Sequence, residues 1–305
     1  MKARGWLATA WCRSLVVLVG LVAACGPAFP GPAGPEDQPK TIRFLDPEFG
    51  VEVDRDIVYS TGAVRRPTVG ELDLLLDVYR PANADQPAIR PGLVLIHGGG
   101  FTGGSRTNST MVTLGTTYAE RGYVAVSIEY RMVRDDPPTE ELSQSPTNPV
   151  SVAAAAARVD AARAVEWMRA NAASYRIDPD RIAVGGYSAG AITAMSVGFL
   201  DPGIGGAEVQ AVLSFSGGLY GAESIIDAGD PPLIMIHGTA DGVVPFSLAE
   251  AIEARALFVG LVHEFYRLDG VGHGSPQQLG AMIEGITLAD RITNFFHAHL
   301  RLEGL

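Results

Sequence analysis

The decapeptide Arg181-Ile182-Ala183-Val184-Gly185-Gly186-Tyr187-Ser188-Ala189-Gly190 decides the fold, because it reads as a buried strand that turns sharply into a helix. Its first half is apolar and β-branched, and an apolar helical stretch follows it. Between the two stands G-x-S-x-G, whose glycines remove the side chains that would collide at such a turn. The turn is expected to strain the backbone of Ser188 and to lift its hydroxyl clear of the sheet. Ser188 is therefore the predicted nucleophile.

Strand-like and helical stretches alternate along most of the chain. Several strand-like runs are apolar throughout, which is typical of strands buried on both faces in a helix-covered parallel sheet. We expect strands at Val51–Tyr59, Leu72–Tyr79, Gly92–Ile96, Tyr123–Tyr130, Arg181–Gly185, Ala211–Phe215, Leu233–Ile236 and Glu264–Leu268, and a long helix at Val152–Tyr175. The first two strands are expected to pair antiparallel at an edge. The pattern predicts an α/β fold: an eight-stranded, mostly parallel sheet with helices on both faces.

A second motif follows the strand that ends at Ile96. The chain there reads His97-Gly98-Gly99-Gly100-Phe101, the HGGG-type loop that supplies oxyanion-hole amides in lipases and esterases. Successive glycines leave their N–H groups unobstructed, so we expect Gly99 and Gly100 to donate, together with the amide of Ala189. His97 is expected to brace the loop through a hydrogen bond, not to act as the base.

The same glycines permit a competing interpretation. Residues 98–103 fit G-x-G-x-x-G after a strand, and Glu129 ends the next strand as a ribose acceptor would. Glu129 comes later in the chain than such an acceptor usually does. The amino terminus predicts that this chain is exported, and nicotinamide cofactors are scarce outside the cytoplasm. A dinucleotide site is therefore the less well supported hypothesis.

Two further strand ends supply an acid and a base. Asp241 follows the strand at 233–236, and His273 lies in a glycine-flanked loop after the last strand. Alone, Asp241 reads equally well as a turn residue and His273 as a solvated histidine, and Asp269 is a rival acid. Ser188, Asp241 and His273 nevertheless follow one another in the order of the α/β-hydrolase triad, each at the carboxyl end of a strand. The combination predicts a catalytic triad.

Together these motifs resemble the α/β-hydrolase superfamily, and within it the HGGG-type carboxylesterases, over roughly residues 70–300. Leu76–Pro81 and Arg181–Gly190 are the most specific stretches. The chain is similar to the subgroup that contains feruloyl and acetyl-xylan esterases and kynurenine formamidases. Tyr187 and Ala191 depart from the pattern of hormone-sensitive-lipase-like members. The resemblance implies ester hydrolysis through an acyl-enzyme, without a metal or another cofactor.

The connection between the sixth and seventh strands, Leu219–Asp230, is too short for a large lid. We therefore expect an open site for short acyl groups, on small-molecule esters or on esters linked to a polysaccharide. A serine peptidase or amidase of the same fold is the alternative activity. A non-catalytic binding module is the alternative of another class.

The amino terminus has the features of an export signal. Positive charges at Lys2, Arg4 and Arg13 precede an apolar run that ends in small residues at Ala24, so residues 1–24 are predicted to be a signal peptide. The run is too short for a transmembrane helix. Val22-Ala23-Ala24-Cys25 resembles a bacterial lipobox, which predicts lipid attachment at Cys25; plain cleavage after Ala24 is the alternative. Residues 25–40 read as a Pro/Gly-rich tether and residues 41–305 as the catalytic domain, on an exported protein that is lipid-anchored to the cell envelope or secreted.

Composition excludes several other classes. With 305 residues, 47% of them hydrophobic, the chain can bury a large core. Its net charge of −11 and pI of about 5.0 show no basic footprint for nucleic acid. Neither lysine lies in a phosphate-binding loop. The two cysteines, Cys12 and Cys25, are too few for a disulfide framework or a zinc site.

Overall fold

The structure, a computed structural model, describes residues 44–82, 89–139, 142, 148–200, 207–274 and 276–303. The predicted signal peptide, the tether and Cys25 lie outside these residues and stay predictions. Within the described part of the chain, no helix combines the length and the apolar character that a membrane crossing requires.

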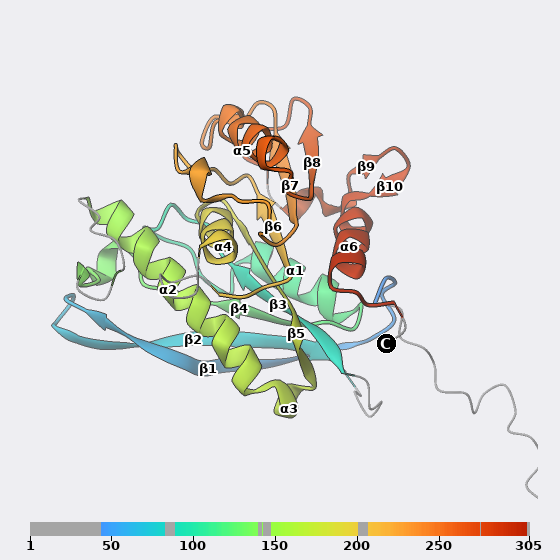
Figure 1. Cartoon of the computed structure of the whole chain (residues 1–305). Helices are drawn as coiled ribbons and strands as arrows, with labels where there is room; N and C mark the ends of the chain where they lie inside the picture. Colours follow the sequence, from blue (N-terminus) through green and yellow to red (C-terminus); the bar gives the residue numbers. More distant parts are fainter. Residues whose placement is uncertain are drawn as a thin grey trace, which may run out of the picture. The chain divides into compact units, whose positions relative to one another are not determined.

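Eight strands form one mixed sheet in the order β1-β2-β4-β3-β5-β6-β7-β8 (Figure 1). β2 pairs antiparallel with both β1 and β4, and all pairs from β4 to β8 are parallel. The strands are β1 Val51–Val64, β2 Gly70–Pro81, β3 Arg90–Ile96, β4 Val124–Ile128, β5 Ile177–Tyr187, β6 Ala211–Phe215, β7 Leu233–Gly238 and β8 His263–Leu268. The predicted mostly parallel sheet with an antiparallel edge is confirmed.

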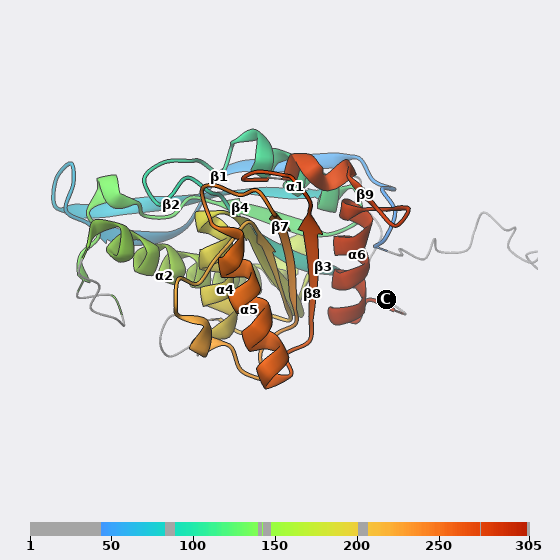
Figure 2. The same cartoon turned by 90° about the horizontal axis from the view of Figure 1, so that it is seen from above.

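Helices cover both faces of the sheet, and each face has its own hydrophobic core. The helices are α1 Ser109–Ala119, α2 Pro149–Ala170, α3 Ala172–Tyr175, α4 Ala189–Phe199, α5 Phe246–Val259 and α6 Leu288–His299. Buried residues of α2, α4 and α5 share one core with one sheet face. Those of α1 and α6 share the other core with the opposite face. Figures 1 and 2 show α2 and α4 along one side of the strands and α1 on the other.

The predicted helix at 152–175 is wrong in its bounds. It begins earlier, at Pro149, because Asn148 caps it by accepting a hydrogen bond from the amide of Ser151 at 2.9 Å. It ends at Ala170, because the backbone of the next residue, Asn171, leaves the helical region; the Asn171 side-chain amide donates to the Trp167 carbonyl at 2.9 Å. The single turn α3 follows. The Ala-rich pattern runs across this break and so conceals it.

The connection from β6 to β7 contains one short 3₁₀ helix, η5, at Glu223–Ile225. A further 3₁₀ turn, η2 (Val133–Asp135), follows β4, and η6 (Pro276–Gly280) precedes a small hairpin of β9 (Met282–Ile283) and β10 (Ile286–Thr287). No large lid is inserted in the β6–β7 connection, all of which is described.

Candidate active site

Ser188 occupies the turn between β5 and α4, in a backbone conformation that non-glycine residues rarely adopt. Its φ is 57° and its ψ is −119°. Its N–H donates to the Phe215 carbonyl at the end of β6, at 2.8 Å. A Cβ on Gly186 would lie 2.3 Å from the Gly190 carbonyl carbon, and one on Gly190 would lie 2.0 Å from the Ile96 oxygen. The glycines of the motif therefore permit the turn to approach β3 this closely.

Ser188, His273 and Asp241 meet at the carboxyl ends of β5, β8 and β7. His273 Nε2 lies 3.0 Å from Ser188 Oγ. Its Nδ1 lies 2.8 Å from Asp241 Oδ2. Ser188 is 8% exposed and the Asp241 side chain is buried, whereas 18% of the His273 side chain reaches solvent. The imidazole thus keeps contact with solvent while the carboxylate stays away from water.

The carboxylate of Asp241 is held by backbone amides as well as by the imidazole. Its Oδ1 accepts from the N–H groups of Val243 and Val244, at 2.8 and 2.9 Å. Burial alone would raise the pKa of Asp241, but the bonds from His273 and from the two amides outweigh it, so the pKa lies below its ordinary value. Asp241 therefore stays ionised next to His273.

Two residues that the sequence analysis did not assign hold the His273 loop in place. The Tyr187 hydroxyl donates to the His273 carbonyl at 3.2 Å, and the two rings lie 5.0 Å apart. The Ser216 hydroxyl donates to the Gly274 carbonyl at 2.9 Å. Tyr187 is the variable residue of G-x-S-x-G, and Ser216 follows β6, so only their positions at strand ends could have suggested this role.

The loop after β3 approaches Ser188. A Cβ on Gly98 would lie 3.1 Å from Ser188 Cβ. Gly99 and Gly100 both have positive φ, 124° and 60°. Within the described residues, no acceptor takes the N–H of Gly99, of Gly100 or of Ala189. These three N–H groups are therefore free to bind another acceptor.

His97 is fully buried beneath this loop and does not contact the triad. Its Nδ1 lies 2.7 Å from the Gly98 carbonyl, and its ring stacks on Tyr130 at 4.3 Å. Its Nε2 lies 3.5 Å from Glu129 Oε2. The expectation that His97 braces the loop agrees with this geometry.

The structure around the glycine loop does not fit a dinucleotide site. Glu129, its expected ribose acceptor, takes hydrogen bonds from the Arg106 guanidinium at 3.2 Å and from the Ser105 hydroxyl at 3.1 Å. The helix that should begin at the glycine loop starts only at Ser109. The rival acid Asp269, at the start of the loop that also holds His273, accepts from Thr239 at 3.1 Å.

Family models match two overlapping parts of the chain. The BD-FAE family matches residues 76–203, and Phospholipase/Carboxylesterase matches residues 153–287. Among solved structures, esterase 2 of Thermogutta terrifontis phosphorylated by paraoxon is 25% identical, with a TM-score of 0.61 over 84% of this chain and 95% of its own. A truncated carbohydrate esterase from gut microbiota, 19% identical with a TM-score of 0.61, shares the fold. The chain belongs to the α/β-hydrolase superfamily. The matches group it with that superfamily's carboxylesterases.

This α/β-hydrolase also matches curated relatives, but it covers a smaller part of each relative's length than it does of the solved structures. Esterase LipQ of Mycobacterium tuberculosis is 27% identical over 74% of this chain and 59% of its own. Chlorogenic acid esterase of Aspergillus niger is 32% identical over 56% of this chain and 31% of its own. The chain spans 7% of methylphloroacetophenone synthase of Cladonia uncialis, with which it is 28% identical. It spans less than two thirds of each of these relatives.

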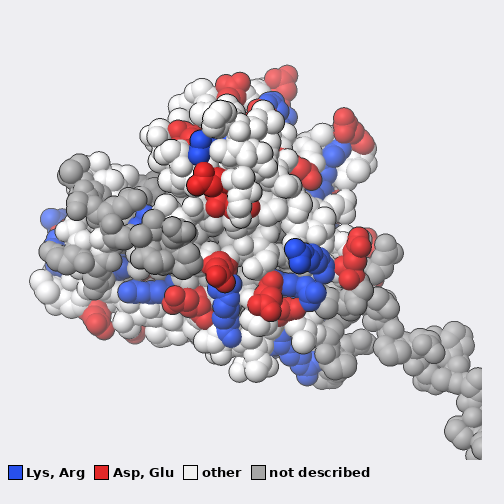
Figure 3. Space-filling model, viewed as in Figure 1, with Lys and Arg blue, Asp and Glu red and all other residues white. Residues whose placement is uncertain are grey.

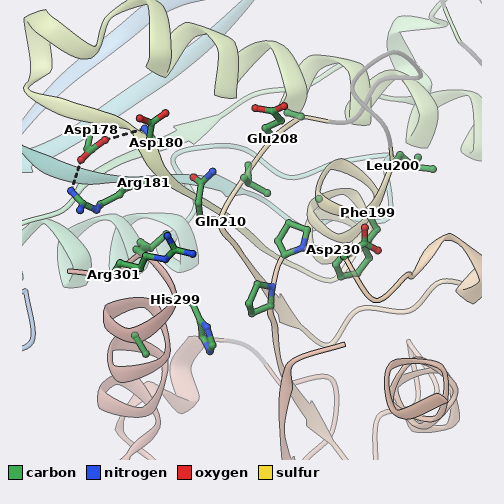
Figure 4. A pocket seen from close by; sticks show the side chains of 18 residues that line it. Asp178, Asp180, Arg181, Phe199, Leu200, Glu208, Gln210, Asp230, His299 and Arg301 are labelled. Carbon is green, nitrogen blue, oxygen red and sulfur yellow. Dashed lines mark hydrogen bonds and ion pairs between the residues drawn. The ribbon is translucent and has the colours of Figure 1, made fainter. Parts of the chain in front are cut away.

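Figure 4 shows a hollow that lies away from the triad, at the opposite end of the α/β-hydrolase sheet. It has a volume of about 830 Å³. Asp178 and Arg181 line it from the start of β5, Gln210 from before β6, and His299 and Arg301 from the end of α6. Asp178 and Arg181 pair with each other at 2.5 Å. None of the predicted site residues reaches this hollow.

The charged side chains of the described residues form neither a metal cluster nor, on the face seen in Figure 3, a basic patch. In the part of the chain with described positions, no three His, Cys, Asp or Glu residues come together as metal ligands would. On the face shown in Figure 3, basic and acidic side chains are interspersed and form no basic patch.

Proposed function

We propose that this α/β-hydrolase is a serine carboxylesterase that acts through an acyl-enzyme on Ser188. Ser188 Oγ attacks the ester carbonyl carbon while its proton passes to His273 Nε2, 3.0 Å away. Asp241 accepts from Nδ1–H, which fixes the tautomer of the ring and offsets the charge of the imidazolium. The N–H groups of Gly99, Gly100 and Ala189 stabilise the oxyanion.

The second half of the reaction reverses these proton transfers. His273 gives its proton to the leaving alcohol, and the ester C–O bond breaks. Water then attacks the acyl-enzyme, gives a proton to His273, and releases the carboxylic acid as Ser188 regains its proton. The observation that carries the proposal is the continuous relay from Asp241 through His273 to Ser188, with contacts of 2.8 and 3.0 Å.

For the substrate, we propose esters of short acyl groups, on small molecules or attached to a polysaccharide. The short β6–β7 connection leaves no large lid to bury a long lipid chain. Esterase 2 of Thermogutta terrifontis, 25% identical with a TM-score of 0.59, has been solved with propionate bound. The chlorogenic acid esterase relative indicates that aromatic acyl groups belong in the same substrate panel.

The test is hydrolysis of p-nitrophenyl esters of graded chain length by the wild type and by Ser188→Ala. We expect the rate to be highest for short chains and to disappear in Ser188→Ala, with an unchanged circular dichroism spectrum. Comparison of a matched ester and anilide separates an esterase from an amidase. Retained turnover in folded Ser188→Ala would refute the assignment.

We further propose that the protein is exported and is lipid-anchored through Cys25. The support is the order of positive charge, apolar run and lipobox-like residues at 22–25. Labelling of bacteria that express the full chain with a clickable fatty acid tests this. We expect label on the wild type and none on Cys25→Ser; secretion of unlabelled wild type would favour plain cleavage after Ala24.

A further inference from the structure

Two imidazoles approach the same oxygen of Asp241. His273 Nδ1 lies 2.8 Å from Oδ2, and His237 Nε2 lies 3.2 Å from it on another side. His237 belongs to the end of β7 and is only 2% exposed. Its Nε2 also lies 2.9 Å from the Val244 carbonyl.

The neighbours of His237 Nε2 determine where its hydrogen is. A backbone carbonyl can only accept, and an ionised carboxylate can only accept. The low pKa of Asp241 keeps its carboxylate ionised. Nε2 therefore carries a hydrogen, which it donates to the Val244 oxygen at 2.9 Å, while Asp241 Oδ2 lies 3.2 Å from the same nitrogen. The hydrogen bond from His237 to Val244 closes the turn that leads from β7 into α5.

We propose that His237 is a positioning residue for the proposed reaction: its Nε2–H binds the Val244 carbonyl next to Asp241 Oδ2, holds the turn that carries the carboxylate in place, and limits the negative charge that Oδ2 presents to His273. This inference rests on the proposed function. It adds a group that acts through the acid and does not touch the substrate.

Four N–H groups lie around the carboxylate. The amides of Val243 and Val244 donate to Oδ1, the His273 ring bonds Oδ2, and the Nε2–H of His237 lies next to Oδ2, with 3.2 Å between the nitrogen and the oxygen. Removing the His237 donor leaves more negative charge on Oδ2. A more negative Oδ2 stabilises the imidazolium form of His273. The pKa of His273 should therefore rise when His237 loses its donor.

The other charged groups near His237 and Asp241 pair with other residues, and two tyrosines lie within reach of the charge of Asp241. In the sheet, His237 is opposite Arg267, which pairs with Glu253. Asp269 accepts from Thr239. The pKa values of Tyr187 and Tyr220 are raised, mainly by burial and further by the charge of Asp241. Among the described residues, Asp241 is the acid that contacts both imidazoles.

The experiment is an NMR titration of the His273 ring in the full chain, which has six histidines. The variants are His237→Phe, which keeps a ring but removes the donor, and His237→Gln, whose side-chain amide can donate again. His263→Phe is the control, because His263 also contacts a carbonyl, that of Leu261 at 3.0 Å, but lies on β8 away from Asp241. The His273 signal is assigned from its loss in His273→Gln.

We expect the His273 pKa to rise by about half a unit or more in His237→Phe, to return toward the wild-type value in His237→Gln, and to stay unchanged in His263→Phe. The acidic limb of kcat/KM for p-nitrophenyl acetate should move to higher pH by the same amount. If His237→Phe does not fold, His237→Asn, whose amide is too short to reach both acceptors, replaces it with the same expected rise.

An unchanged or lowered His273 pKa in the donor-free variant, or a failure of His237→Gln to restore it, would overturn the role of His237. The titration needs no turnover. An inactive wild type would therefore refute the proposed function separately and leave the effect of His237 on His273 measurable.

Discussion

The ring of His97 fixes the direction of the peptide that joins Gly98 to Gly99. Its Nδ1 lies 2.7 Å from the Gly98 carbonyl, which can only accept, so Nδ1 donates. In a trans peptide the C=O and the following N–H point in opposite directions. Because the Gly98 carbonyl points to a buried ring, the Gly99 N–H points away from the interior, on the side available to an oxyanion.

Replacing His97 should therefore impair the chemical step more than substrate binding. We expect His97→Ala to lower kcat by about tenfold to 100-fold, less than the full loss of an oxyanion donor, with a small change in KM. Steady-state kinetics with p-nitrophenyl acetate measure this. Tyr130→Phe is the matched control, because it removes the hydroxyl bond to the His97 carbonyl and keeps the Nδ1 bond. Equal losses in both variants would contradict a specific role for Nδ1.

Gly99 and Gly100 should tolerate a methyl group very differently. A Cβ on Gly99 would lie 2.1 Å from the Gly103 carbonyl oxygen, whereas one on Gly100 would meet nothing closer than Thr102 Oγ1 at 3.9 Å. We expect Gly99→Ala to lower kcat/KM by about 100-fold or more, and Gly100→Ala by no more than about tenfold, the strain of its positive φ being modest. A larger loss for Gly100→Ala would show that the loop geometry is different.

Asp241→Asn should remove most of the activity and alter the acid stability. The amide holds His273 in the wrong tautomer, so we expect kcat to fall by about 10³- to 10⁴-fold. Because the folded pKa of Asp241 lies below its unfolded value, ionisation stabilises the fold above about pH 4, and this contribution is lost as the pH falls further. Urea denaturation should show that the stability advantage of the wild type over Asp241→Asn shrinks on acidification; an advantage that grows in acid would contradict this.

Ser216→Ala should loosen the His273 loop without unfolding the protein. The variant removes the bond from Ser216 Oγ to the Gly274 carbonyl, one hydrogen bond of about 1 kcal/mol. We expect kcat/KM to fall by roughly fivefold. Ser196→Ala is the control, since Ser196 bonds to the Ile192 carbonyl within α4. A loss of activity that is as large in Ser196→Ala would indicate a general effect on stability.

The sequence predicts the fold well, and places Ser188, Asp241 and His273 at strand ends, because the determinants of strands and turns are local. All eight strands are present, and Ser188, Asp241 and His273 follow strands whose ends lie side by side in a parallel sheet. β5 begins earlier than predicted, at Ile177, because it pairs there with Arg90. The charged residues and the proline at 178–181 conceal this strand start from pattern analysis.

The contacts that sequence reasoning missed join residues from separate segments. His237 reads as an ordinary core histidine until the turn brings Asp241 and Val244 to its Nε2. Glu129 reads as a ribose acceptor until Arg106 is found to bind it. The identity of a side chain does not reveal such long-range partners. The predictions for residues 1–40 and Cys25 stay open for the experiments proposed above.

The central claim is that His273 and Asp241 make the hydroxyl of Ser188 nucleophilic. Peptide mapping by mass spectrometry after brief treatment with a fluorophosphonate tests it most directly. The account predicts one adduct, on Ser188, formed rapidly in the wild type and far more slowly in His273→Ala. An unlabelled wild type, an adduct on another serine such as Ser216, or equally fast labelling of His273→Ala would contradict it.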